Sequence, residues 1–408
     1  MDASNGPGGD ERPGLAILLN GLTPYNVHLC ARLGREMTDV RVHSVFTTSG
    51  SDWQEIDLPP EANAARFGHA ETDRQEDWST VRLSDIGRAR RIFEHLRRHR
   101  VDAVVHCGYA SLLHLRLIAL CRAAGMSVFL RGDSNIKGEG RRRFPMSWLK
   151  KRLLGWAIRR CQGVMPMGEY GRQYFEKYGA DLSRSYLVPF EPQYEKFTNV
   201  DRALVDPFGA EHDLSADRRR MLYCGRLVDV KRVDLLIDAF SSIAERRPPW
   251  DLVIAGDGPL RADLEARVPA ALKDRVRWLG FCEVEQLRLA YHLCDVLVLP
   301  SEYEPWAVVI NEACAAGLVV VASDVVGAAR QLVRDRESGR IFRSGDVADL
   351  TDALLDVTDD ATWGQYQGRV AGVLADWRRD ADPVDGVRAA LRAVGVLEEP
   401  RMNTDGHG

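Results

Sequence analysis

Residues 300–324, PSEYEPWAVVINEACAAGLVVVASD, decide the fold that we predict for this chain. They begin where an apolar run ends, pass through a helical pattern at 306–316, and enter a second apolar run at 318–322. Strand, helix and strand in this order form the βαβ unit of a parallel sheet. Glu304 lies just before the helix, and Glu312 follows about two helical turns later. We therefore expect two carboxylates at the carboxyl edge of the sheet, beside a helix N-terminus whose free N–H groups suit a phosphate.

This stretch resembles the E-x7-E signature of the retaining family-4 glycosyltransferases of GT-B fold, with Glu304 and Glu312 at the two motif positions. The resemblance implies that the first Glu contacts hydroxyls of the donor sugar and that the second accepts hydrogen bonds from the nucleotide ribose. It also implies that the backbone amides of Trp306, Ala307 and Val308 hold the donor diphosphate. Where the family has Gly-Phe-Gly, this chain has Pro-Trp-Ala directly after Glu304. Taken alone, Glu304 is equally explained as a charge in the first turn of a helix.

A short basic turn supplies the candidate phosphate cations. The sequence GRLVDVKR at 225–232 follows a predicted strand and resembles the G-R-x4-K element of the same family. The resemblance implies that Arg226 and Lys231 clamp the donor diphosphate and that Gly225 belongs to the donor-binding loop. A leaving nucleoside diphosphate gains negative charge as the glycosidic bond breaks, and two fixed cations offset that charge. We therefore expect no metal and no cofactor; the alternative interpretation of the turn is ordinary surface charge.

Two further strand ends are expected on the donor side. Gly256 opens the Gly-rich turn that follows a predicted strand at 251–255, and Phe281 follows a predicted strand at 275–279. The resemblance places Gly256 in the donor loop and Phe281 near the nucleotide base, and core packing of Phe281 is an equal alternative. The D-x-D sequence at 380–382 lies far from any predicted strand end, so we interpret it as a solvated pair at a helix boundary.

Six residues of the first half follow predicted strands and are expected to face the acceptor across the same cleft. In an α/β sheet, ligands bind beyond the carboxyl ends of the strands. The resemblance also implies that a histidine near the end of the fourth strand approaches the donor sugar, and the match in this chain is His106, for which core packing is an equal alternative. The candidates are Tyr25, Asn26, His106, Tyr109, Arg131 and Asp133.

The predicted organisation is α/β, with two Rossmann-like doubly wound domains facing each other across a cleft, the GT-B arrangement that the resemblance implies. Residues 14–200 are predicted to bind the acceptor, and residues 201–380 the nucleotide sugar. A strand at 185–189 is expected to close the first domain, and the linker is expected at 190–206, which lacks hydrophobic periodicity. Residues 381–397 are expected to form a helix that crosses back to the first domain.

Composition excludes several classes of protein. A chain of 408 residues with 45% hydrophobic and 28% charged residues is typical of a globular protein with two or three domains. The net charge of −4 argues against a nucleic-acid partner. The 8 cysteines include no C-x-x-C pair, which indicates reduced residues of a cytoplasmic protein. The tails at 1–13 and 398–408 are predicted to be disordered, and neither a signal peptide nor a membrane span is expected.

Residues 137–160 are strongly basic and carry tryptophans and leucines. Two interpretations stay open. A basic amphipathic helix with tryptophan lies well on an anionic membrane surface, and this would place the protein at the cytoplasmic membrane face. An ordinary helix that covers the sheet and exposes a cationic face explains the same pattern. The basic residues are Lys137, Arg141, Arg142, Arg143, Lys150, Lys151, Arg152, Arg159 and Arg160, against the one acidic residue Glu139.

Together with these observations, the resemblance implies a retaining, metal-independent glycosyltransferase that moves a sugar from a nucleotide-diphosphate sugar to a hydroxyl acceptor. The acceptor is a glycan, a lipid-linked sugar or a small molecule, in polysaccharide or glycoconjugate biosynthesis. Two alternatives remain. One is another enzyme of the same fold, a sugar-nucleotide epimerase or a phosphorylase with pyridoxal phosphate. The other is a GT-B protein that binds a nucleotide sugar without transferring it.

Overall fold

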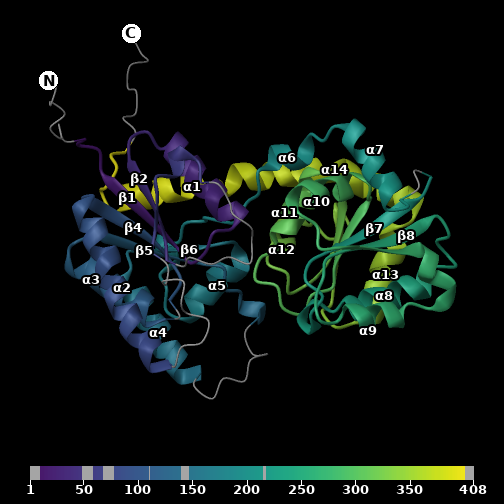
Figure 1. Cartoon of the computed structure of the whole chain (residues 1–408), viewed down its shortest axis with the longest axis horizontal. Coiled ribbons are helices and arrows are strands. Elements are labelled where there is room, and N and C mark those ends of the chain that lie inside the picture. The colour runs from purple at the N-terminus through teal and green to yellow at the C-terminus, as the bar shows by residue number, and fades with distance from the viewer. Residues whose placement is uncertain are drawn as a thin grey trace, which may run out of the picture.

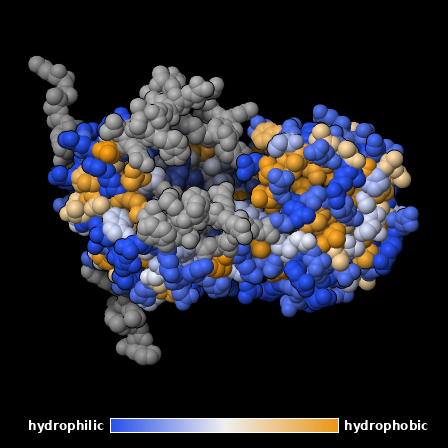
Figure 2. Space-filling view, turned by 90° about the horizontal axis from the view of Figure 1, so that it is seen from below, coloured by the Kyte–Doolittle hydropathy of each residue, from blue (hydrophilic) through white to orange (hydrophobic). Residues whose placement is uncertain are grey.

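The computed structural model describes residues 10–47, 58–67, 78–109, 111–138, 147–214 and 217–399. Most of the two tails that we predict to be disordered lies outside these ranges. Two parallel sheets lie side by side along the long axis, each with its own helices (Figure 1). Where the described residues are seen in Figure 2, hydrophilic areas surround separate apolar areas on both halves. This confirms the predicted α/β architecture of two doubly wound domains.

The first sheet has the strand order β3-β2-β1-β4-β5-β6. Both of its faces are covered, as the side chains of β1 (Gly14–Leu19) show. Leu15 and Ile17 pack with α1 (Pro24–Glu36) and α15 (Pro383–Ala393), while Ala16 and Leu18 pack on the other face with α2 (Trp78–Arg98) and α3 (Leu112–Ala123). The strands are β1 (Gly14–Leu19), β2 (Arg41–Phe46), β3 (Ala64–Arg66), β4 (Val101–Cys107), β5 (Ser127–Gly132) and β6 (Gly163–Pro166). The helices of this half are α1 (Pro24–Glu36), η1 (Pro60–Ala62), α2 (Trp78–Arg98), α3 (Leu112–Ala123), η2 (Ile136–Gly138), α4 (Ser147–Arg160), α5 (Glu169–Lys177) and η3 (Leu182–Arg184).

The second sheet has the strand order β12-β11-β10-β7-β8-β9. Its strands are nearly continuous apolar runs, as in Val319–Ser323, because helices cover both faces. The strands are β7 (Arg219–Cys224), β8 (Trp250–Ala255), β9 (Val276–Gly280), β10 (Val296–Leu299), β11 (Val319–Ser323) and β12 (Gly339–Phe342). The helices are η4 (Asp229–Lys231), α8 (Val233–Ile243), α9 (Arg261–Arg267), η5 (Ala270–Arg275), α10 (Val284–His292), α11 (Val308–Ala315), α12 (Ala329–Leu332), α13 (Val347–Val357) and α14 (Asp360–Asp380).

The chain order reverses once in each sheet. In the second sheet, β8 and β9 lie on one side of β7, and β10 to β12 lie on the other. In the first sheet, the same reversal falls between β1 and β4. Loops that leave two neighbouring strands in opposite directions open a crevice between them, which is where doubly wound sheets bind ligands. The loops after β7 and β10, and those after β1 and β4, are therefore the places to look for a site.

The chain crosses between the two halves twice. On the first crossing, Val188 packs in the core of the first sheet and Tyr194 in that of the second. On the second, Ala381 packs in the core of the second sheet and Val384, at the start of α15 (Pro383–Ala393), in that of the first. The core of the second sheet thus already includes Tyr194, which precedes the boundary predicted between residues 200 and 201.

Two sequence predictions need correction. The predicted strand at 185–189 is reduced to an isolated bridge between Val164 and Ser185. The region predicted as an aperiodic linker contains α6 (Tyr194–Thr198) and α7 (Arg202–Glu211), and Pro207 lies inside α7. Short helices of this kind leave no periodic signal, and burial of their apolar residues against the second half stabilises them despite the proline.

Candidate active site

The candidate site lies where β7 and β10 end, at the reversal point of the second sheet. The loop after β7 carries Arg226 and Lys231, and the loop after β10 carries Glu304. A backbone hydrogen bond of 2.8 Å from the N–H of Glu302 to the carbonyl of Val230 ties the two loops together. The structure therefore brings the predicted G-R-x4-K turn and the first glutamate of the E-x7-E stretch to one place.

Lys231 and Glu304 face each other directly. The ammonium of Lys231 donates a hydrogen bond to the carboxylate of Glu304, and their side chains are only 17% and 15% exposed. Arg226 is exposed, and no described residue pairs with its guanidinium, whereas the hydroxyl of Tyr223 donates to its carbonyl at 2.9 Å. One cation of the turn is thus already neutralised by a carboxylate, and the other is available to solvent.

Two glycines let the neighbouring loops approach closely. Gly225 and Gly256 have φ angles of +152° and +154°, in the region that favours glycine. A Cβ atom on Gly256 would lie 1.9 Å from the carbonyl oxygen of Gly225, so no other residue fits there. The N–H of Gly225 donates to Ala255 at 3.0 Å. The two glycines hold the loops after β7 and β8 against each other and so fix the position of the basic turn.

In the segment that starts at Glu304, the backbone carbonyls accept hydrogen bonds, while the backbone amides that follow donate none to a described residue. Gly327 and Ala328 donate backbone hydrogen bonds to the carbonyls of Glu304 and Trp306. In the described part of the chain, nothing accepts from the amides of residues 306–308. Ala307 has φ +82° and is the residue before α11, so the helix begins at Val308 and not at residue 306 as predicted. The chain turns sharply here and presents free N–H groups at the N-terminus of α11.

Glu312 lies half-buried in the second turn of α11. The hydroxyl of Tyr291 donates to its carboxylate at 2.9 Å, and burial raises the pKa of Glu312 to about 7 although this hydrogen bond opposes the shift. Burial also raises the pKa of Tyr291. Glu312 is therefore a carboxyl group that titrates near neutral pH, with one oxygen fixed by a tyrosine that sequence reasoning missed. Nothing in the sequence around Tyr291 distinguishes it from a core residue.

Phe281 follows β9 at the same edge of the sheet. Its side chain is 60% exposed, which is unusual for a large apolar residue. This excludes the alternative in which Phe281 packs in the core. An exposed aromatic ring at the carboxyl edge of the sheet is available to stack on a planar group.

Three of the predicted acceptor-side residues are buried and make internal contacts, so the structure does not place them on an open face of the cleft. Asn26 is buried and donates to the carbonyl of Gly21 at 3.0 Å, which closes the turn before α1. His106 is completely buried with its Nδ1 3.1 Å from the carbonyl of Gly108, and burial lowers its pKa to about 3. Arg131 is buried and donates to the carbonyls of residues 188 and 189. The sequence positions them at strand ends, but side-chain direction depends on tertiary packing.

The other three predicted acceptor-side residues keep contact with solvent. Asp133 is exposed, yet desolvation raises the pKa of its carboxyl group, and a backbone hydrogen bond and the charge of Arg131 only partly offset this shift. Tyr25 is half-buried, and desolvation raises its pKa. Tyr109 is half-buried, with its hydroxyl 2.5 Å from that of Ser134. Tyr25 and Asp133 lie near enough to interact electrostatically, so both belong to one surface of the crevice.

The first half touches the candidate site through a residue that sequence reasoning missed. Asn135 is buried, and its amide donates to the carbonyl of Val325 at 2.9 Å and to that of Glu304 at 3.3 Å. Its neighbour Lys137 pairs with Asp324 at 3.3 Å. Asn135 ends the turn after β5, so its position at a strand end was the available signal. The two halves therefore meet at the loop that carries Glu304.

Comparison with known proteins is consistent with this geometry. Residues 208–368 match the family model described as glycosyl transferases group 1. The solved structure of HepE from Anabaena in complex with UDP superposes with a TM-score of 0.70 at 15% identity, covering 94% of this chain and all of that one. This likeness confirms the predicted GT-B fold. In the part of the chain that the structure describes, no helix is both long and apolar enough to cross a bilayer.

Two curated relatives are similar to parts of this sequence. The alpha-D-kanosaminyltransferase of Streptomyces kanamyceticus is 38% identical over 34% of this chain and 37% of its own. The lipopolysaccharide core biosynthesis mannosyltransferase LpsB of Rhizobium meliloti is 30% identical over 62% of this chain and 70% of its own. The chain spans between 28% and 48% of several other curated relatives. On the strength of the match to LpsB and to the family model, the chain belongs to the group 1 glycosyltransferases.

Proposed function

We propose that this protein is a retaining glycosyltransferase that moves a sugar from a nucleotide-diphosphate sugar to a hydroxyl acceptor. The observation that carries the proposal is the arrangement at the ends of β7 and β10, where Lys231 faces Glu304 beside the unused amides of residues 306–308. A cation and converging N–H groups suit a diphosphate, and a carboxylate next to them suits sugar hydroxyls. Glu312 is placed deeper along α11, where its free oxygen suits the ribose hydroxyls.

In the proposed reaction, the bond between the sugar C1 and the bridging phosphate oxygen breaks, and its electron pair stays on the nucleoside diphosphate. The acceptor hydroxyl oxygen forms the new bond to C1 on the same face, so the configuration is retained. Its proton goes to an oxygen of the departing phosphate. Lys231 and Arg226 stabilise the growing negative charge, each worth about 3 kcal/mol when well aimed. We propose that these two cations take the place of a metal ion and that no cofactor takes part.

The names of the relatives support a role in making polysaccharides or glycoconjugates. One is named for transfer of kanosamine and another for mannose transfer in lipopolysaccharide core biosynthesis. The structurally similar protein HepE has been solved in complex with UDP and in complex with UDP-glucose. We propose a nucleoside diphosphate sugar as the donor, and a glycan, a lipid-linked sugar or a small molecule as the acceptor.

The proposal is tested by thermal unfolding with UDP, GDP and ADP and their sugar conjugates. A nucleotide at 100 times its Kd adds about 2.7 kcal/mol, which raises the Tm of a chain this long by roughly 3 °C. We expect one base to give this shift, Glu312→Gln to reduce it, and the exposed-site control Glu265→Gln to preserve it. No shift with any nucleotide contradicts the proposal. A shift without turnover of any donor supports the non-catalytic alternative.

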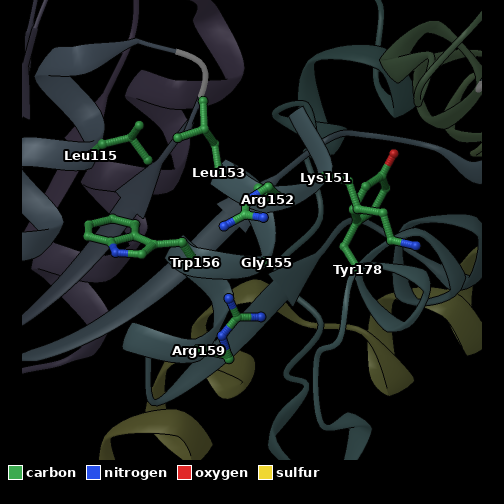
Figure 3. Close-up of a pocket in the computed structure, with 8 residues that line it drawn as sticks. All are labelled: Leu115, Lys151, Arg152, Leu153, Gly155, Trp156, Arg159 and Tyr178. Atoms are coloured by element: carbon green, nitrogen blue, oxygen red, sulfur yellow. The ribbon is translucent and has the colours of Figure 1, made fainter. Parts of the chain in front are cut away.

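We also propose that the first half contacts an anionic membrane through α4. Arg152 and Arg159 lie near apolar side chains, and no described residue forms an ion pair with either guanidinium. Leu112 on α3 and Leu153 on α4 are 54% and 40% exposed. Cations next to exposed leucines and a tryptophan suit the interface of an anionic bilayer. The cations of α4 also line a cavity of about 690 Å³ (Figure 3). The lining residues are Leu115, Lys151, Arg152, Leu153, Gly155, Trp156, Arg159 and Tyr178.

A further inference from the structure

The side chain of Trp306 points away from the donor loop that its backbone forms. Its indole N–H donates to the carbonyl of Phe190 at 3.1 Å, in the segment that crosses between the two halves. The ring is buried and lies against that of Trp377, with 5.7 Å between the ring centroids. A Cβ atom on Gly168 would lie 2.8 Å from the indole, so the first half packs closely on the same ring. Trp306 therefore joins the donor loop to the crossing segment and to the first half.

Phe190 continues this contact to the acceptor side of the cleft. Its ring lies 4.5 Å from that of Tyr25, measured between centroids, on the loop side of α1. The guanidinium of Arg131 lies over the same ring, 4.5 Å from its centroid, and donates to the carbonyls of residues 188 and 189. The backbone on the N-terminal side of Phe190 is thus fixed to the first half, while its own carbonyl is held by the indole of the second.

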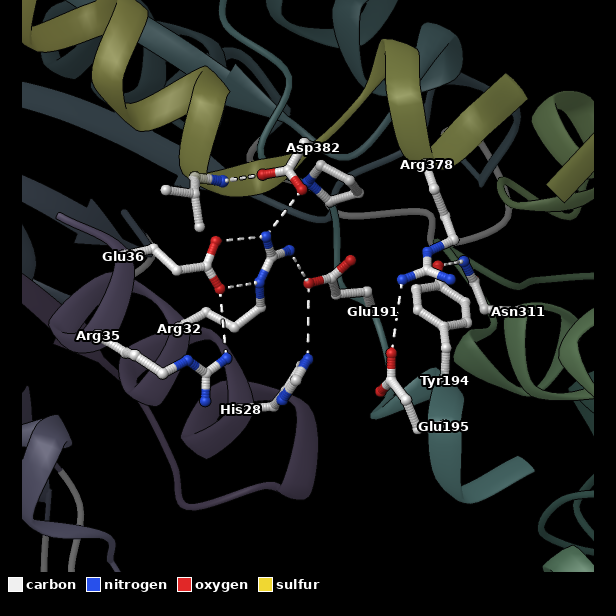
Figure 4. A network of polar contacts seen from close by, with 12 residues as sticks. His28, Arg32, Arg35, Glu36, Glu191, Tyr194, Glu195, Asn311, Arg378 and Asp382 are labelled. Carbon is white, nitrogen blue, oxygen red and sulfur yellow. Dashed lines mark hydrogen bonds and ion pairs between the residues drawn. The ribbon is translucent and has the colours of Figure 1, made fainter. Parts of the chain in front are cut away.

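A second group of contacts shows that the crossing segment is held firmly on both sides of this point. Arg32 on α1 binds Glu191 at 2.6 Å and Asp382, at the second crossing, at 2.8 Å (Figure 4). Beyond it, Tyr194 accepts a hydrogen bond of 2.9 Å from Asn311 on α11. Because the backbone on both sides of residue 190 is held, a displacement of Phe190 moves its ring relative to Tyr25 and is not taken up by movement of the neighbouring residues.

We infer that Trp306 is a positioning residue that transmits occupation of the donor loop to Tyr25 on the acceptor side, through Phe190. The inference rests on the proposed function, since the backbone amide of Trp306 is one of the three that we assign to the diphosphate. A phosphate held by that amide fixes the backbone of Trp306, and the indole carries the same constraint to the carbonyl of Phe190. The ring of Phe190 then restrains Tyr25. Donor binding would in this way order the acceptor side before the acceptor arrives.

Hydrogen exchange followed by mass spectrometry tests this path in the full chain. The readout is the change caused by saturating UDP, GDP or ADP in segments 304–312, 186–192 and 20–28. In the wild type, we expect the nucleotide that binds to slow exchange in all three segments. In Trp306→Phe, which keeps a ring and loses the N–H, segment 304–312 should still be slowed. The nucleotide-dependent slowing of exchange in segments 186–192 and 20–28 should become about five-fold smaller, because one hydrogen bond contributes a free energy equivalent to a factor of about five.

Two further variants separate the path from a general loss of stability. Trp377→Phe makes the same chemical change in the partner ring, which donates no hydrogen bond to the crossing segment, and should keep the wild-type response. Phe190→Ala keeps the carbonyl that accepts from Trp306 but removes the half-buried ring. It should preserve the slowing in 186–192 and lose it in 20–28. In turnover, Trp306→Phe should leave the KM for the donor within about two-fold and lower kcat about five-fold.

The outcomes are distinct. If Trp306→Phe responds like Trp377→Phe in segment 20–28, or if the wild type is slowed only in 304–312, the transmission through Trp306 is refuted while the proposed donor site stands. If no nucleotide slows 304–312 in the wild type, the proposed function itself fails and the inference falls with it. If Trp306→Phe does not fold, the response of Phe190→Ala decides: normal slowing in 20–28 overturns the path.

Discussion

Lys231 and Glu304 form an ion pair across the reversal point of the second sheet, between the loop after β7 and the loop after β10. The pair is largely shielded from solvent, so each charge is stabilised mainly by the other. A donor diphosphate would compete with Glu304 for the ammonium and release the carboxylate toward the sugar. The pair thus couples the two functions that we assign to these residues.

Replacing Lys231 tests this coupling most directly. We expect Lys231→Ala to lower kcat about 100-fold, because one well-aimed cation contributes about 3 kcal/mol to the transition state. Stability should fall by about 3 kcal/mol, because the largely shielded Glu304 loses its cation. The control is Lys196→Ala, which removes a cation from an exposed ion pair with Glu285. Normal turnover by the Lys231 variant would remove this residue from the site.

Glu312 should make stability depend on pH near neutrality. Its pKa is about 7 in the folded chain and near 4.5 in the unfolded one, so the folded state binds more protons between these values. Stability should therefore fall as the pH rises from about 4.5 to 7, by at most about 3 kcal/mol from this group. Urea unfolding across this range should show a smaller fall in Glu312→Gln than in the wild type. Equal slopes would show that the carboxyl group is not held in a dry environment.

The left-handed backbone of Ala307 predicts a stabilising substitution. At φ +82° an alanine is strained by about 1 kcal/mol, and glycine removes the strain. We expect Ala307→Gly to raise the free energy of unfolding by up to about 1 kcal/mol, measured by urea denaturation. Ala371→Gly makes the same change at an exposed position within α14 and should lower it by about 1 kcal/mol. Destabilisation by both would contradict the backbone geometry assigned to Ala307.

Arg32 should be the main polar support of the two crossings. It pairs with Glu36, Glu191 and Asp382, and the side chain of Glu191 is only 8% exposed. Removing the guanidinium leaves Glu191 buried without its cation, which costs about 3 kcal/mol. Arg35→Ala is the matched control on the same helix, because among the described residues Arg35 pairs with Glu36 alone, at the surface (Figure 4). Thermal unfolding should show a large loss for Arg32→Ala and almost none for Arg35→Ala.

Membrane contact through α4 predicts a charge-dependent affinity for vesicles. We expect the chain to sediment with vesicles containing phosphatidylglycerol and not with neutral phosphatidylcholine vesicles. Replacing Lys151, Arg152 and Arg159 together by Gln should weaken this binding about 100-fold, because each cation contributes near an anionic surface. Lys273, Arg336 and Arg369, exposed cations of the second half, provide a triple control of equal charge. Equal loss in both triple variants would assign the binding to net charge alone.

Much of the proposed donor side could be predicted from the sequence, because its signals are local. The strand–helix–strand pattern at 300–324 fixes the place of Glu304 and Glu312 at a sheet edge, and the basic turn after β7 ends at the neighbouring strand. Phe281 also lies where its strand end predicts. Spacing along the chain is sufficient for these residues, since the geometry of a βαβ unit fixes where its loop emerges.

The tertiary structure alone decided the rest. His106 and Arg131 follow strands as clearly as Glu304 does, yet packing turns one into the core and binds the other to carbonyls of the crossing segment. The contacts of Asn135, Trp306 and Arg32 join segments more than 100 residues apart. Sequence patterns report the periodicity of one element at a time, whereas side-chain direction and pairing between elements depend on which surfaces meet after folding. The sequence by itself therefore determined the fold and the donor loop, and only the folded chain determined how its two halves are joined.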